Sequence, residues 1–308
     1  MKKSRYEIST FKKGLSGPVP SIMTAFLRNG AMDYDGVANQ IEQAIAGGTT
    51  ALLLTWGDSH FSSLKDEEIV QLNQFVIAQA KKRVMVIASG NRWPTMAAVE
   101  FANTCKKWGA DLHNSLAPNW GNAGNPETFY EHYRAIGQVM PVMAMTSMAP
   151  GPPLPLATVG MLLEDVESGL VAIKDDICGL YGKRMALLVR GRCAFLSGGM
   201  KMNYMDERCY GADGYLSEFM SLCPSVAMAF WGHIQDGNIE RGMEMVRDLE
   251  MPFMFDLCEE IGLDNDGLLH AAMEVFGVCG RWRRNPYQNA TDQQMEKIRE
   301  FLSGKNLL

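Results

Sequence analysis

Hydrophobic and polar positions follow a repeating pattern along most of the chain, in which a short apolar run precedes a longer amphipathic stretch. The runs have the length of buried strands, and the stretches have the spacing of helices. We expect strands over residues 19–27, 51–55, 84–88, 111–116, 141–146, 170–174, 193–197 and 214–217. We expect helices at about residues 33–46, 65–82, 95–109, 127–138, 157–166, 181–189 and 201–209.

This alternation predicts an α/β fold, namely a (β/α)8 TIM barrel with a C-terminal helical extension. An open doubly wound sheet is the alternative, but no Gly-x-Gly-x-x-Gly motif follows the first strand. Beyond residue 224 the pattern becomes helical only, at about 225–261, 265–278 and 292–303. We therefore expect the barrel over residues 18–224 and a helical subdomain, packed on the barrel, over residues 225–308.

Composition excludes several classes of partner. The net charge is −6 and no basic block is present, which argues against nucleic acid or an anionic membrane surface. The seven cysteines show neither Cys-x-x-Cys nor Cys/His ligand spacing, which predicts reduced thiols in a cytoplasmic protein. The first residues lack the apolar core of a signal peptide, and no apolar run has the length of a membrane span.

Lys174 is the leading candidate for chemistry. It ends the apolar run 170–173, which places its amine at the carboxyl end of the sixth expected strand, where barrels hold their active sites. Burial disfavours the charged ammonium, and a neutral lysine amine can attack a carbonyl carbon. From the residues alone, a surface lysine just beyond a strand is the other interpretation.

Other polar side chains follow the expected strands at the same end of the barrel. The candidates for proton transfer or carboxylate binding are Asp58, Ser59, His60, Thr146 and Ser147. The candidates that complete a substrate site are Trp120, Ser197, Gly198 and Gly199. The Gly198-Gly199 pair fits either a phosphate-binding turn or an ordinary tight turn. Asp58 and His60 could begin a metal site with His113, but no paired ligand motif is visible and we expect no metal.

The chain resembles the dihydrodipicolinate synthase / N-acetylneuraminate lyase family of class I aldolase-like barrels in PSIMTAFLRNGAMD, AIAGGTTALLL, AIKDD, FLSGG and GADGYLS. The resemblance covers residues 20–302. It implies a lyase, synthase or dehydratase in which Lys174 forms a Schiff base with pyruvate or another small 2-oxo acid, without a cofactor. It also implies a homo-oligomer, because members are commonly tetramers.

The chain also departs from this family. Members carry a Gly-x-x-Gly-Glu loop after strand two, whose hydroxyls bind the 2-oxo acid carboxylate, and this chain has Trp56-Gly57-Asp58-Ser59-His60 there. Met145 stands at the family's proton-relaying tyrosine, and Trp120 replaces a second tyrosine. These departures indicate a divergent member, with Tyr181 and His60 as candidate replacement acids.

Two alternatives to the Schiff-base enzyme follow from these departures. The first is a catalytically impaired barrel that binds a small acid or a protein partner without turnover. The second is a metal-dependent aldolase that uses Asp58 and His60, whose activity would be lost with a chelator.

Overall fold

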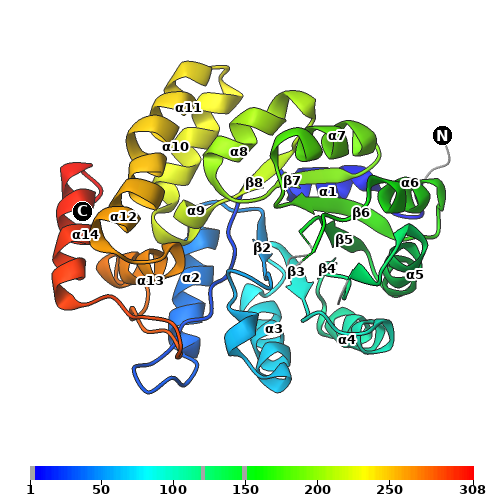
Figure 1. Cartoon of the computed structure of the whole chain (residues 1–308), viewed down its shortest axis with the longest axis horizontal. Helices are drawn as coiled ribbons and strands as arrows, with labels where there is room; N and C mark the ends of the chain where they lie inside the picture. The colour runs from blue at the N-terminus through cyan, green and yellow to red at the C-terminus, as the bar shows by residue number, and fades with distance from the viewer. Residues whose placement is uncertain (1–3, 119–121, 148–150) are drawn as a thin grey trace.

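The computed structural model describes residues 4–118, 122–147 and 151–308, which form a ring of parallel strands surrounded by helices (Figure 1). The strands are β1 (Gly17–Val19), β2 (Ala51–Leu53), β3 (Met85–Ser89), β4 (Leu112–Ser115), β5 (Val142–Met145), β6 (Leu170–Asp175), β7 (Ala194–Ser197) and β8 (Gly214–Leu216). The first eight α-helices are α1 (Ile8–Gly14), α2 (Tyr34–Ala46), α3 (Asp66–Ala80), α4 (Thr95–Trp108), α5 (Pro126–Gly137), α6 (Leu156–Glu164), α7 (Gly179–Val189) and α8 (Met200–Glu207). The later α-helices are α9 (Glu218–Leu222), α10 (Pro224–Gln235), α11 (Ile239–Met245), α12 (Leu257–Ile261), α13 (Asn265–Val275) and α14 (Asp292–Gly304). Shorter turns of helix are η1 (Phe61–Ser63), η3 (Arg208–Tyr210), η4 (Val246–Glu250) and η5 (Pro252–Asp256).

The strands form one eight-stranded parallel sheet in the order β1-β8-β7-β6-β5-β4-β3-β2. A parallel bridge between Ser21 and Leu53 joins its two edges, where Ile22 N–H donates to the Leu53 carbonyl at 2.8 Å. The predicted (β/α)8 barrel is therefore confirmed. The carboxyl ends of all strands lie at one end of the ring, and we call this end, with the loops that follow the strands, the barrel mouth.

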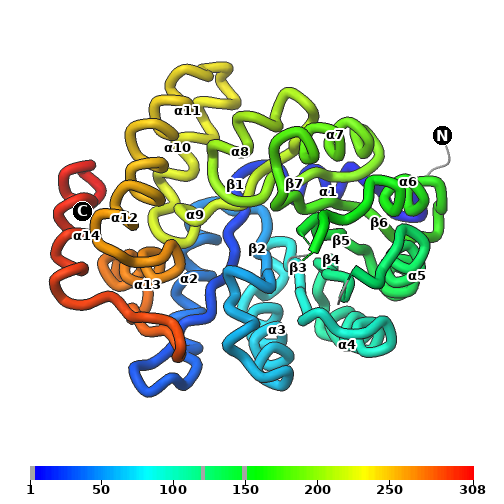
Figure 2. The backbone as a smooth tube through the Cα atoms, viewed as in Figure 1, coloured from blue at the N-terminus to red at the C-terminus, as the bar shows by residue number. Residues whose placement is uncertain are grey.

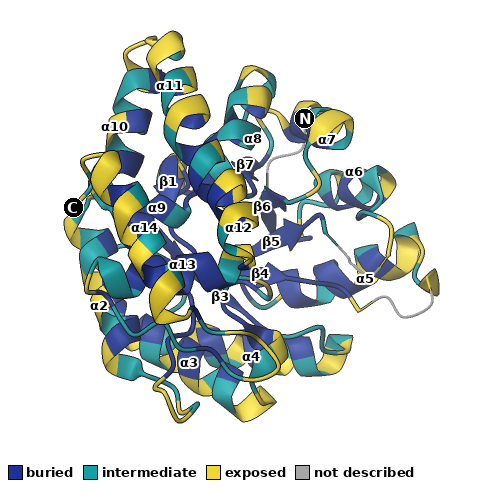
Figure 3. Ribbon diagram, turned by 60° about the vertical axis from the view of Figure 1, so that its left-hand side comes forward, coloured by how far each residue is buried: buried dark blue, intermediate teal, exposed yellow. Residues whose placement is uncertain are grey.

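Nearly all strand residues are buried, and helices cover the outside of the barrel (Figure 3). The apolar side chains of several strands pack together inside the barrel. Strands in this setting are continuous apolar runs and do not alternate apolar and polar residues, as the sequence shows. The helices carry polar residues on their outer face, and several have local start signals. The Asp33 side chain accepts a hydrogen bond from Gly36 N–H to cap α2, and Asn125 caps α5 before Pro126.

Three expectations about the elements are corrected. The first strand was expected over 19–27, but β1 ends at Val19 because Pro20 has no N–H to continue the ladder. A continuous helix was expected over 225–261, but α10 ends at Gln235, and Gly237 turns the chain with a φ of 75° before α11. The helices α1 and α9 were not expected.

The C-terminal helices pack against α2 and α9 at one side of the ring (Figures 1 and 2). Their buried cluster includes Leu268 and Ile298 from the C-terminal helices together with Met23 and Phe219 from the barrel region. This shared core fixes the C-terminal helices beside the loops after β1 and β8. In the described parts of the chain, every helix is too short or too polar to cross a membrane.

Candidate active site

Lys174 lies in β6 with its side chain inside the barrel, beside Met145 of β5 and Leu196 of β7. Only 3% of its surface is exposed, and its Nζ donates to Asp176 Oδ1 in an ion pair. Burial raises the pKa of Asp176, and the Lys174 charge opposes that increase. The Asp176 carboxyl therefore contacts Lys174 Nζ. This nitrogen must lose a proton before it can attack a carbonyl carbon.

The backbone around Asp176 places its carboxyl beside Lys174. Asp176 N–H donates to Thr146 Oγ1 at 3.0 Å, which ties the end of β6 to the end of β5. Gly198, after β7, makes the room: a Cβ at this position would lie 2.0 Å from Asp176 Oδ1. Gly198 is therefore needed for the close packing of this carboxyl and has no free surface for a ligand there.

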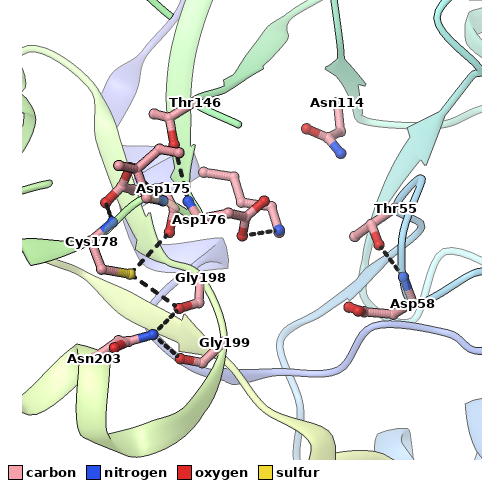
Figure 4. Close-up of polar contacts among 12 residues, drawn as sticks. Thr55, Asp58, Asn114, Thr146, Asp175, Asp176, Cys178, Gly198, Gly199 and Asn203 are labelled. Carbon is pink, nitrogen blue, oxygen red and sulfur yellow. Dashed lines mark hydrogen bonds and ion pairs between the residues drawn. The ribbon is translucent and has the colours of Figure 1, made fainter. Parts of the chain in front are cut away.

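Asp175 points to the other side of β6, as alternation along a strand requires. Its carboxyl accepts from Thr146 Oγ1 at 2.5 Å and from Cys178 N–H at 2.9 Å (Figure 4). Thr146 is thus occupied by Asp175 and by the Asp176 backbone. We expected it to bind substrate, and the structure places it as an anchor for the end of β6.

A second carboxyl, Glu207 of α8, is fully buried next to Asp175. Burial raises the pKa of Glu207 to about 8, and the nearby Asp175 charge adds to the increase. Ser197 lies beside this pair and is fully buried.

The same place has the only close set of metal-type ligands within residues 4–118, 122–147 and 151–308. One ligand atom each from Asp175, Cys178 and Glu207 lies within 4.8 Å of the others, so these residues could hold a small cation. The set considered as an alternative metal site, Asp58 and His60 with His113, is not brought together in the described part of the chain.

In the loop after β2, the side chains of Ser59 and His60 form hydrogen bonds with other parts of the protein. Ser59 is buried, with its Oγ donating to the Ile22 carbonyl at 2.6 Å and accepting from Thr55 N–H at 3.0 Å. His60 is buried too, and its Nε2 lies 2.8 Å from Nε2 of His270 on α13. Burial lowers the pKa of His60 to about 4. Ser59 therefore has no hydroxyl proton left for a substrate carboxylate, and His60 faces the C-terminal helices.

Asp58, in contrast, projects into the mouth. Its backbone N–H donates to Thr55 Oγ1 at 3.2 Å, and its carboxylate has no hydrogen-bond or ion-pair partner among the described residues. Figure 4 shows the carboxylates of Asp58 and Asp176 and the amide of Asn114 pointing toward one another across the mouth. Asn114, at the end of β4, is fully buried, and its Oδ1 lacks a described partner.

The remaining predicted residues lie in other settings. The Tyr181 hydroxyl donates to the Leu154 carbonyl at 2.6 Å, on the outer side of the barrel with Asp175. Ser147 is partly buried after β5, and Gly199 follows Gly198 with a φ of 53°. Trp120 lies outside the described residues.

Three mouth residues were assigned no role from the sequence. Asp176 and Asn114 are two of them, and the third is Arg92, whose guanidinium lies 4.4 Å above the Trp56 ring without a described ion-pair partner. The sequence held a signal for two of them. Asp176 belongs to the pair of aspartates directly after Lys174, and Asn114 is a polar residue near the end of an apolar strand.

Comparison with known proteins identifies the group to which this fold and lysine belong. The model of the Dihydrodipicolinate synthetase family matches residues 14–305. The chain belongs to this family. It is 22% identical over 300 residues to a 4-hydroxy-tetrahydrodipicolinate synthase of Chlorobium phaeobacteroides (strain BS1), covering 96% of this chain and 99% of that protein.

Solved structures show the same fold. N-acetylneuraminate lyase from Fusobacterium nucleatum superposes with a TM-score of 0.83 at 16% identity, covering 94% of this chain and 99% of the other. Dihydrodipicolinate synthase from Acinetobacter baumannii, solved with pyruvate, superposes with a TM-score of 0.79 at 23% identity, covering 96% and 100%. The predicted family membership is confirmed, and a lyase or synthase of this family is the supported class of enzyme.

Proposed function

We propose that this protein is an imine-forming lyase, in which Lys174 condenses with the carbonyl carbon of a small 2-oxo compound. The observation that carries the proposal is the buried Lys174 amine at the end of β6, in contact with a carboxyl that can accept its proton. Pyruvate and other small 2-oxo acids are the first compounds to test, because one related structure holds pyruvate.

The chemistry requires a neutral amine. After the ammonium loses a proton, the Nζ lone pair attacks the carbonyl carbon, and a new C–N bond forms. The carbonyl oxygen takes up two protons and leaves as water, which gives the imine. A protonated imine then withdraws electrons from the adjacent carbon, so that a bond to that carbon can break or form. The proposal needs no metal and no further cofactor.

Asp176 is the group we assign to proton transfer at Nζ. The family's tyrosine position is Met145, which is buried beside Lys174 and has no proton to exchange. Asp176 already contacts Nζ, and its raised pKa brings it closer to the range in which a carboxyl both accepts and returns a proton.

The test is reductive trapping. The protein is incubated with pyruvate and a panel of small 2-oxo compounds, reduced with borohydride and weighed by mass spectrometry. An adduct is expected with the wild type and not with Lys174→Met. Lys183→Met, which removes a partly exposed lysine paired with Asp206, is the matched control and should keep the adduct. Wild-type protein that gives no adduct with any compound would contradict the proposal.

A barrel that binds a small acid without turnover is the second candidate. It is favoured by Met145 and by the occupied Ser59 hydroxyl, which together remove two functional groups of the family site. This candidate predicts a trapped imine or a bound acid but no steady-state product. The metal-dependent aldolase predicts that a chelator abolishes activity and that Lys174→Met does not.

A further inference from the structure

The charge of the barrel mouth influences which substituent a substrate can carry next to its carbonyl group. Asp58 acts on four titratable neighbours: it raises the pKa of Asp176, Glu218 and Asp266, and it opposes the decrease at His60. The negative charge of Asp58 therefore acts on all four groups. An incoming carboxylate would add a further negative charge to this set.

Three cations near these groups already form ion pairs with carboxylates. Lys174 pairs with Asp176, Lys201 pairs with Glu250 at 2.9 Å, and Arg283 pairs with Asp264 at 2.6 Å. Within the described ranges, Asp58 and Glu218 have no cation partner. The segments 119–121 and 148–150 hold no lysine or arginine in the sequence.

Arg92 is a mouth cation without an ion-pair partner among the described residues. Its guanidinium stacks on Trp56, and the largest charge effects on the pKa of Asp176, Glu218 and Asp266 come from other residues. The carboxylates around Asp58 therefore keep an excess of negative charge.

Hydrogen bonding in the mouth also disfavours a substrate carboxylate. Asn114 is fully buried, and its amide nitrogen faces the Leu54 carbonyl and Ser89 Oγ at 3.5 Å, which directs Oδ1 away from them. That Oδ1 has no described donor, and the Asp58 carboxylate also offers only acceptor atoms. A buried acceptor without a donor is costly to leave unpaired, and a carboxylate cannot supply a proton to either of these acceptors.

We propose that the carbonyl compound which condenses with Lys174 carries an uncharged, hydrogen-bond-donating group, such as a hydroxyl, where the family's substrates carry a carboxylate. Asp58 receives that donor. The inference rests on the proposed imine at Lys174 and specifies its substrate class. Asp58 is thus a specificity-determining residue, since it stands in the loop whose hydroxyls hold the carboxylate in the family.

Two three-carbon ketones make the comparison sharp. Pyruvate has a carboxylate next to its carbonyl, and hydroxyacetone has a hydroxymethyl group in the same place. Each is trapped with cyanoborohydride on the wild type, Asp58→Asn and the surface control Asp236→Asn. The adduct rates are divided by those of a free lysine derivative under the same conditions, which removes the intrinsic reactivity of the ketones.

The normalised wild-type rate should favour hydroxyacetone by about tenfold or more, the size expected from one unpaired like charge at short range. Asp58→Asn should raise the pyruvate rate and narrow the ratio to about threefold or less, while Asp236→Asn keeps the wild-type ratio. A wild-type preference for pyruvate, or a pyruvate rate unchanged in Asp58→Asn, overturns the substrate class while the imine at Lys174 stands. No adduct with either ketone overturns the imine itself.

Discussion

Gly198 lies so close to Asp176 that a Cβ at position 198 would be 2.0 Å from Asp176 Oδ1. Gly198→Ala should therefore displace this carboxyl, and with it the Asp175 carbonyl group, whose oxygen also lies within contact distance of the added Cβ. We expect turnover to fall by about 10²-fold or more, the usual contribution of a positioned acid or base, and imine trapping at Lys174 to become slower. Gly160→Ala, on α6 with open space at its Cβ, is the control and should keep wild-type activity. Equal turnover in the two variants would show that the position of Asp176 is not important.

Breaking the buried ion pair between Lys201 and Glu250 should lower the free energy of unfolding. Both side chains are 1% exposed, with Nζ and Oε1 2.9 Å apart, and Glu250 also accepts from the backbone N–H groups of Lys201 and Met202. Lys201→Met leaves a buried carboxylate without its cation, so we expect the free energy of unfolding to fall by about 3–5 kcal/mol in urea titrations. Arg299→Gln, which breaks an exposed pair with Glu296, should cost less than about 1 kcal/mol. Similar losses in both variants would contradict this account.

The His60–His270 contact should make stability depend on pH. Burial lowers the pKa of His60 to about 4 and lowers the pKa of His270 as well. The unfolded chain therefore binds more protons than the folded chain between about pH 6.5 and about pH 4, and stability falls as pH falls through this window.

The measurement is unfolding by urea at several pH values. His270→Gln removes one titrating group, so the variant should lose about 1.4 kcal/mol less per pH unit than the wild type within the window. Asp266, whose pKa burial raises to about 6, has the opposite effect in both proteins and cancels in the comparison. His233→Gln, on the partly exposed α10, is the control. Parallel pH profiles for the wild type and His270→Gln would refute the assignment.

Glu207 should have the opposite pH dependence. Burial raises the pKa of Glu207 to about 8, above the usual value of a glutamate, so the folded chain binds more protons and stability falls as pH rises toward 8. Glu207→Gln mimics the protonated acid. We expect near-equal stability at about pH 4, below the usual glutamate pKa, and an advantage for the variant that is on the order of 2 kcal/mol at pH 6 and larger still at pH 9. A variant that is destabilised equally at all of these pH values would instead favour a bound cation between Asp175 and Glu207.

The fold could be predicted because its determinants are local and repeated. Apolar runs buried on both faces identify strands β2 to β8, and the run that ends in Lys174 locates the nucleophile. The first strand was misplaced because the run 19–27 is apolar, and only the missing N–H of Pro20 explains why the ladder stops. The break between α10 and α11 was missed because it depends on the positive φ of Gly237, which lies within a sequence pattern typical of a helix.

The partners of the site could not be predicted because they come from distant segments. Ser59 resembled a substrate-binding residue in sequence, but the Ile22 carbonyl takes its proton. His60 resembled an acid, but His270 lies 210 residues away in the chain and contacts its ring. Asp176 was visible beside Lys174, yet its role depends on the room that Gly198 leaves after β7.

The central claim is that the Lys174 amine forms an imine with a small 2-oxo compound. The most direct measurement is peptide mapping by mass spectrometry after cyanoborohydride reduction with pyruvate or hydroxyacetone. The account predicts that the mass of one reduced ketone appears on the peptide that contains Lys174 and on no other. An adduct that maps to the buried Lys201 or to surface lysines, with Lys174 unmodified, would contradict it.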